Sequence, residues 1–467
     1  MNQEASETTA LMRRAQKKPP TPLPKLQLGI IMLTLVCGPI AAGSIYPYVN
    51  ELVSELGITG SDERRAGYYA GLESLFYVTQ AMTVLQLSSA SDYVGRKPTL
   101  WMSLFGTSLS MLCFGLSRSF WMLVVTRCLT GFSNGNLGII KTALADLTDR
   151  SNQAQAVAFL PIMWELGSAF GFFLGGQLSQ PQRRFPNMFP GTFWGHYPYF
   201  LPSLATGSFV GLVGLLVLLF FKETAPHKKR PIWDGLDDPN GHISISPPST
   251  PRSLLQLFTF PVMISLFNNI ALSLLNIAVV SLVPLFFAMP ITVGGLGLPP
   301  QKIGSAMAIQ GVAIAGFQLL FFAKITRRFG ERAVMIAGLS MFPVIFGLMP
   351  VISTVAQQAG QSAAVWILVA FLLSLNILPD MCLGVVWMFL NASAPKESRG
   401  AVNGLGQTAV SVARAIGPAL STSLFSLSVE RNLLGGYAVY AILGAISVGA
   451  VILAMRLPRE LWEEEDL

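Results

Sequence analysis

Charged residues are scarce in this chain. They make up only 12% of its 467 residues, whereas hydrophobic residues make up 52%. A soluble domain carries about 25% charged residues. One water-exposed globule could not hide so much apolar surface, so lipid must be the solvent for most of the molecule. The composition therefore predicts an integral membrane protein.

Histidine and cysteine are also rare, with 3 and 4 copies. The histidines fall outside the apolar runs, while the cysteines lie inside them, where they pack as small apolar side chains rather than form a disulfide framework. No C-x-x-C or H-E-x-x-H spacing occurs, which argues against a metal enzyme. No nucleophile–base–orienter set or phosphate loop is evident either, so we expect neither enzymatic activity nor a cofactor.

Basic residues give a net charge of +7, but they are dispersed among loops and form no groove-sized patch with interleaved aromatics. Nucleic-acid binding is therefore not expected. The first 27 residues are basic and contain no apolar region of signal-peptide type, which is typical of a cytosolic tail.

Windows of about 20 apolar residues, the length of a transmembrane helix, recur along the chain. They begin near Leu28, Gly67, Thr99, Phe120, Gln155, Tyr199, Val262, Ile303, Ala333, Ala364, Gly400 and Gly436. The sequence thus predicts an all-α membrane protein of twelve helices. A polar, proline-punctuated stretch divides it. The predicted parts are a cytosolic tail (1–27), a six-helix bundle (28–221), a cytosolic linker (222–256), a second six-helix bundle (257–457) and an acidic cytosolic tail (458–467).

The distribution of Lys and Arg supports this topology. With both termini in the cytosol, 21 of the 31 lie in cytosolic segments, 7 in external ones and 3 inside helices. This asymmetry follows the positive-inside tendency. A dileucine-type pattern, Glu7 followed by Leu11 and Met12, favours the vacuolar over the plasma membrane.

Six ionisable residues lie inside the predicted helices, where each costs about 2.5–3.5 kcal/mol on insertion scales unless it faces a cavity or a partner. They are Glu73, Arg127, Lys141, Glu165, Asp380 and Arg414. Polar stripes with helical spacing add Asn134, Asn376, Asn403 and Gln407. We expect these ten side chains to line a central cavity that binds substrate or couples protons.

Plainer interpretations exist for the same residues. Lone amides can simply hold helices together, and Lys141 can extend its ammonium to the membrane interface. Glu73 can form a permanent salt bridge with Arg127. Burial favours the neutral form of a carboxyl group, so either Glu73 or Glu165 could carry a proton as its exposure changes.

A compact charged turn, Ser91-Asp92-Tyr93-Val94-Gly95-Arg96-Lys97-Pro98, joins two apolar runs. A basic-glycine turn recurs at Gly330 in the second half. Such an echo is expected when two bundles are related by an axis along the membrane normal.

The charged turn resembles the D-x-x-G-R-[RK] loop signature of the major facilitator superfamily. Arg127-Cys-Leu-Thr-Gly131, with Asp146 beyond it, also resembles that family. Gly167-Ser-Ala-Phe-Gly171-Phe-Phe-Leu-Gly175-Gly176 is similar to its antiporter signature G-x-x-x-G-P-x-x-G-G, except that Phe172 stands where the signature has proline. Small residues of these and related stretches should let helices pack closely. They are Gly131, Gly135, Gly167, Gly171, Gly175, Gly176, Gly417 and Pro418.

Two further stretches, 67–74 and 134–136, resemble a fungal branch similar to zinc-induced-facilitator-like and drug/proton antiporter-like transporters. The resemblance implies a secondary transporter that moves a small molecule or ion across the bilayer by alternating access. We expect protons as the coupling ion and a monomer as the functional unit. The alternative is a non-transporting solute sensor with the same fold.

The resemblance also implies a cytosolic gate. Asp92 would meet the start of the eleventh helix near Gly400, and Arg96 would pair with Asp146, followed by the basic Lys97. Gly95 would supply the tight turn. The alternative is that these charges only anchor the loop and fix topology.

Overall fold

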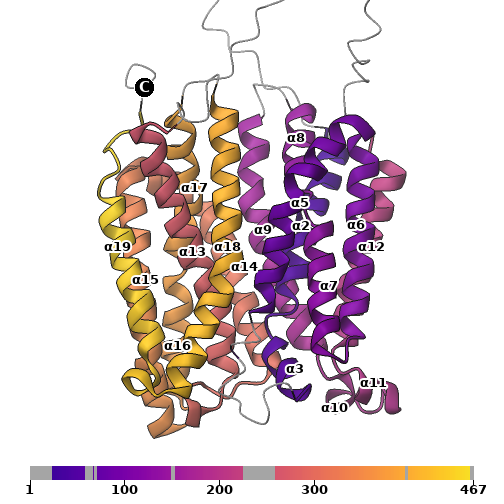
Figure 1. Cartoon of the computed structure of the whole chain (residues 1–467), viewed down its shortest axis with the longest axis vertical. Helices are drawn as coiled ribbons and strands as arrows, with labels where there is room; N and C mark the ends of the chain where they lie inside the picture. The colour runs from indigo at the N-terminus through magenta and orange to yellow at the C-terminus, as the bar shows by residue number, and fades with distance from the viewer. Residues whose placement is uncertain are drawn as a thin grey trace, which may run out of the picture.

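The structure is a computed structural model that describes residues 24–57, 67, 71–148, 153–224, 258–394 and 398–462. Within these ranges the secondary structure is helical, with no strand. Two bundles stand side by side, one from each half of the chain (Figure 1).

The first bundle contains α2 (Lys25–Gly43), α3 (Val49–Glu55), α5 (Leu72–Val94), α6 (Arg96–Gly115), α7 (Phe120–Ser133), α8 (Leu137–Leu147), α9 (Gln153–Leu178), α10 (Pro181–Arg184), α11 (Thr192–His196) and α12 (Phe200–Phe220). The second contains α13 (Phe260–Ala288), η4 (Ile291–Val293), α14 (Pro300–Phe329), α15 (Glu331–Ala359), α16 (Ala363–Leu375), α17 (Ile377–Ala392), α18 (Arg399–Glu430), η5 (Leu433–Gly436) and α19 (Ala438–Ala454).

The two ends of the molecule differ. We call the end where α12 finishes and α13 starts the linker face, which is at the top of Figure 1. The opposite end carries the short elements α3, α10, α11, η4 and η5, and we call it the far face.

The predicted twelve-helix membrane fold is confirmed. Among the described residues, eight helical segments are long and apolar enough to cross a membrane. The other four crossings are each too short or too polar to meet that length and hydropathy criterion, for identifiable reasons. The helices α5 and α6 are rich in Ser and Thr, α7 and α8 divide one crossing between them, and α19 has 17 residues.

The fourth helix of each bundle is broken, and the break in the first bundle was not predicted from the sequence. Residues 134–136 form a turn between α7 and α8, and α16 meets α17 at Asn376. Asn disfavours helix interiors because its short amide competes for backbone hydrogen bonds. The polar stripe expected to run straight from Arg127 to Lys141 is therefore split between two helices.

Each bundle has its own apolar core. In the first bundle, buried side chains such as Leu100, Ile139 and Val213 pack together. The second bundle has a larger core that includes Phe346 and Val386. Tyr46 and Phe172 of the first bundle join that second core, so the bundles touch along apolar side chains as well as polar ones.

The glycines of α9 lie against the backbone of α2. A Cβ on Gly167 would lie 3.0 Å from the carbonyl oxygen of Val36, and one on Gly171 would lie 2.7 Å from that of Ile40. Gly175 lies still closer to the backbone carbonyl of Ser44. Phe172, on the same helix, leaves this spacing intact, so α9 stays a continuous helix along α2.

Other members of the predicted glycine set also lie where helices approach closely. Gly131 and Gly135 face α5 at Phe76 and Thr83, and Gly417 faces Ile277 of α13. Pro418 lies inside α18.

Candidate functional site

A cavity of about 90 Å³ lies between the bundles. Three charged side chains line it, namely Glu165 of α9, Asp380 of α17 and Arg414 of α18. Asn376, at the break between α16 and α17, lines it too. All four belong to the predicted cavity set. The volume is well below the roughly 300–1,000 Å³ of drug-sized ligand pockets, so the pathway is nearly closed around this point.

Two amides of the lining, Asn276 and Gln310, are missing from the predicted set. Asn276 lies seven residues after Asn269, and this helical spacing is the signal that could have identified it. Gln310 is an isolated polar side chain in a strongly apolar run, which is its own signal. Aromatic side chains complete the lining. They are Tyr46, Tyr77, Trp164 and Phe172.

The charged groups of the cavity interact with one another. Asn276 donates an Nδ2–H bond to Oδ1 of Asp380 at 2.8 Å. Glu165 interacts electrostatically with both Asp380 and Arg414, and the Arg414 guanidinium lies 5.3 Å from the centre of the Trp164 ring. With both acids ionised, the three groups carry one net negative charge. A single proton or another cation can balance it.

Backbone packing closes the cavity toward the far face. A Cβ on Gly176 of α9 would lie 2.8 Å from Cα of Gly304 on α14. Beside them, Gln177 donates to Oγ of Ser305 at 2.8 Å. On the other flank, the Ala419 N–H of α18 donates to Oγ of Ser74 at 2.9 Å.

Side chains bridge the bundles toward the linker face. The Lys141 ammonium of α8 lies 4.2 Å from the centre of the Trp387 ring on α17 and donates to Oε1 of Gln407 on α18 at 3.4 Å. Asn403, one turn nearer the linker face, donates to Oδ1 of Asn391 at 2.7 Å within the second bundle.

Glu73, Arg127 and Asn134 lie inside the first bundle and outside the cavity lining. Arg127 pairs with Glu73 at 3.5 Å. The backbone carbonyl of Asn134 accepts a hydrogen bond from Gln80 at 2.9 Å. The structure thus divides the predicted cavity set into cavity-lining, bridging and bundle-interior residues.

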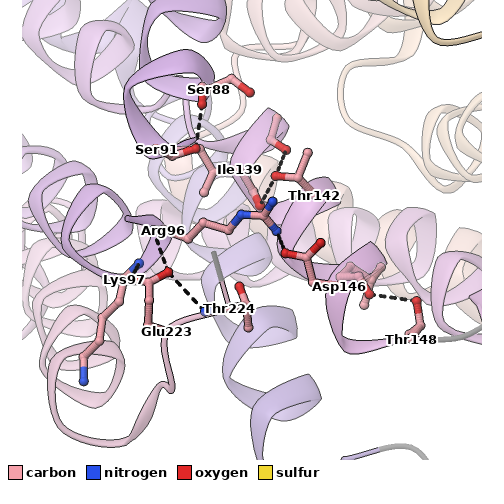
Figure 2. A network of polar contacts seen from close by, with 12 residues as sticks. Ser88, Ser91, Arg96, Lys97, Ile139, Thr142, Asp146, Thr148, Glu223 and Thr224 are labelled. Carbon is pink, nitrogen blue, oxygen red and sulfur yellow. Dashed lines mark hydrogen bonds and ion pairs between the residues drawn. The ribbon is translucent and has the colours of Figure 1, made fainter. Parts of the chain in front are cut away.

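The charged turn at the linker face joins three segments of the first bundle (Figure 2). Gly95 caps α5 and precedes α6 with φ = +111°, a region that glycine adopts without strain. Arg96 forms an ion pair with Asp146 of α8. The side chain of Asp92 lies outside the described residues, and so does its predicted contact near Gly400.

Glu223, which follows α12, completes this turn and was not predicted. Its carboxylate accepts backbone N–H bonds from Arg96 at 2.9 Å and Lys97 at 3.0 Å (Figure 2). A negative charge at the first turn of α6 is favoured by the helix dipole. The available signal was an acid two residues after the end of an apolar run. Gly330 repeats the Gly95 geometry between α14 and α15, with φ = +80°, which confirms the predicted echo.

Two helical bundles around a charged, nearly closed cavity define a membrane transporter. Comparison with known proteins identifies the family. The Major Facilitator Superfamily model matches residues 31–418 and 272–464. The chain belongs to the major facilitator superfamily, whose members are transporters and not enzymes.

Three similar proteins illustrate this membership. The chain is 31% identical to the major facilitator-type transporter psiT2 of Psilocybe cyanescens, across 97% of this chain and 93% of that protein. It is 27% identical to the protein ZINC INDUCED FACILITATOR-LIKE 1 of Arabidopsis thaliana, across 93% and 91%. A solved D-xylose-proton symporter superposes with a TM-score of 0.69 at 16% identity, across 94% and 99%. The predicted placement near fungal and zinc-induced-facilitator-like members is confirmed.

Proposed function

We propose that this transporter moves a small solute by alternating access and couples that movement to protons, with Glu165 and Asp380 as the proton-binding groups. The charge count of the central cavity carries this proposal, because two carboxyl groups share one guanidinium there. The arrangement favours Glu165 over Glu73 as the carrier, since Glu73 is paired with Arg127 outside the lining.

In this mechanism the bundles 28–221 and 257–457 rock against each other, joined by the linker 222–256. Uptake of a proton at Glu165 or Asp380 removes the excess negative charge and favours the closed cavity. Release on the other side restores the charge and favours solute binding. Ionisable groups inside the membrane that face a water-filled pathway suit such a relay.

The test is solute flux in sealed proteoliposomes that contain a pH-sensitive dye, screened with a panel of small organic solutes. We expect concentrative uptake that an uncoupler abolishes. Glu165→Gln should retain solute exchange but lose the proton flux. Glu331→Gln, the same substitution at the linker-face turn of the second bundle, is the matched control. Solute accumulation that is insensitive to the uncoupler would refute the coupling.

We further propose that the linker face is cytosolic, with both termini on that side, that the protein resides in the vacuolar rather than the plasma membrane, and that it works as a monomer. The positive-inside tendency supports the orientation. Cysteines placed at Arg327, exposed on the linker face, and Arg431, exposed on the far face, would report it. A membrane-impermeant maleimide applied to intact vacuoles should label position 327 and not 431.

A further inference from the structure

The linker-face side of the cavity is closed by two layers of side chains. With a rise of about 1.5 Å per helical residue, Lys141, Trp387 and Gln407 lie about 8–12 Å from the linker-face ends of α8, α17 and α18. Arg414 and Trp164 lie deeper, about 17–22 Å from the ends of α18 and α9. The outer layer therefore lies between the cavity and the linker face. The inner layer is part of the cavity wall itself, which Arg414 and Trp164 line.

In each layer a cation of one bundle rests on an indole of the other. Lys141 of the first bundle contacts Trp387 of the second at 4.2 Å. Arg414 of the second bundle contacts Trp164 of the first at 5.3 Å. The two contacts thus cross the interface in opposite directions. Lys and Arg within about 6 Å of a Trp ring centre are attracted by its quadrupole, and the attraction grows when water is removed.

This closure differs from the one toward the far face. There, Gly176 and Gly304 bring two backbones together, whereas here side chains reach across. A side-chain bridge can break by rotamer change, while a glycine contact requires the helices to separate. The two sides of the cavity therefore open by different movements.

We propose that Trp387 and Trp164 are gating residues of the transport cycle. Their indole faces hold Lys141 and Arg414 when the linker-face side is closed and release them when it opens. Gln407 supports the outer contact by accepting a hydrogen bond from Lys141. This inference rests on the alternating-access part of the proposed function. It assigns the side chains that set the fraction of molecules whose linker-face side is closed.

The test is a spin-label distance measurement that needs no known solute. One label pair, at Tyr93 and Phe329, reports the linker face, and a second pair, at Met188 and Leu434, reports the far face. All four side chains are exposed. The labels are attached to introduced cysteines after Cys37, Cys113, Cys128 and Cys382 are replaced.

Lys141→Met and Trp387→Leu should each increase the open-to-closed ratio of the linker-face pair by about tenfold, as loss of a desolvated cation–π contact predicts. Trp164→Leu should act in the same direction. Lys141→Arg and Trp387→Phe, which keep a cation and a ring, should restore the closed population. The double variant Lys141→Met/Trp387→Leu should equal either single variant, because both remove the same contact.

Lys302→Met is the matched control. Lys302 lies 5.6 Å from the Trp366 ring centre within the second bundle, so its loss should leave both label pairs unchanged. Label pairs that respond to pH while Lys141→Met behaves like Lys302→Met overturn the gate and leave alternating access standing. If the label distances stay fixed in every variant and at every pH, both the gate and alternating access are overturned.

Discussion

The guanidinium of Arg127 lies 3.5 Å from the carboxylate of Glu73 in the interior of the first bundle, and the two side chains are 0% and 1% exposed. The ring of Phe114 covers the guanidinium at 4.4 Å. In the described part of the chain, neither Glu73 oxygen has a hydrogen-bond partner. Mutual neutralisation is therefore the main compensation for burying these two charges.

Removing one charge of this pair should be more harmful than removing both. Glu73→Gln leaves the Arg127 guanidinium buried without a counter-charge, which costs about 3–5 kcal/mol. Glu73→Gln/Arg127→Met removes both charges and should recover most of that loss. Unfolding of the purified parent, single variant and double variant in mixed micelles measures their free energies of unfolding. If Glu73→Gln were as stable as the parent, the Glu73 carboxylate would not be what compensates the buried charge of Arg127.

The ion pair between Arg96 and Asp146 joins α6 to α8 within the first bundle, so it should stabilise the linker-face end of that bundle. Asp146 is 33% exposed, so solvent screening limits the pair to about 1 kcal/mol, or roughly a fivefold change in population. Arg96→Gln and Asp146→Asn should each lower the free energy of unfolding in mixed micelles by about that amount. The exchange Arg96→Asp/Asp146→Arg should restore part of the lost stability. An exchange no more stable than the single variants would contradict this prediction.

Substitution of Gly95 should cost more than substitution of its counterpart Gly330. Both have positive φ, which costs a non-glycine residue about 1–3 kcal/mol. A Cβ on Gly95 would also lie 2.7 Å from Oε2 of Glu223, whereas nothing lies within 4 Å of one on Gly330. The midpoint of thermal unfolding should therefore be lower for Gly95→Ala than for Gly330→Ala. The reverse order would show that Glu223 moves aside freely.

Gly176→Val should prevent closure toward the far face. The added side chain meets the Pro300 carbonyl and the Gly304 backbone, and backbone cannot yield as a flexible side chain can. The Met188–Leu434 label pair should lengthen, while Gly316→Val should leave it unchanged because nothing lies within 4 Å of that position. An unchanged pair in Gly176→Val would mean that α9 and α14 tolerate separation without opening.

A pH-dependent effect is expected at the far face, beyond the end of α2. Burial raises the pKa of Glu51 above its ordinary value, against the opposing hydrogen bond from Gln180. The folded state thus favours the neutral acid, so Glu51 costs stability as pH rises above about 4.3, the usual value for Glu. Glu51→Gln should stabilise the protein by less than about 1 kcal/mol at neutral pH and not at all in acid. The free energy of unfolding of Glu51→Gln and of the parent, measured at neutral and acid pH, checks this prediction. A stability gain found only in acid would contradict it.

The sequence alone determined the class of this protein. Long apolar runs have no stable place except a bilayer, and helix geometry sets the length that each run needs to cross it. The turns at Gly95 and Gly330 were also predictable, because a local backbone requirement selects glycine. The small residues of α9 were predictable for a similar reason, since their spacing places them on one side of a single helix.

Only the tertiary structure decided which embedded charges meet. Helical spacing assigns Glu165, Asp380 and Arg414 to faces of α9, α17 and α18, but rotation and neighbours of those helices depend on packing between segments more than 200 residues apart. The same spacing grouped Arg127 with Lys141, yet the break at residues 134–136 sends one into the first bundle and the other across to Trp387. A periodic pattern holds only while its helix is continuous, and continuity is decided by the surrounding fold.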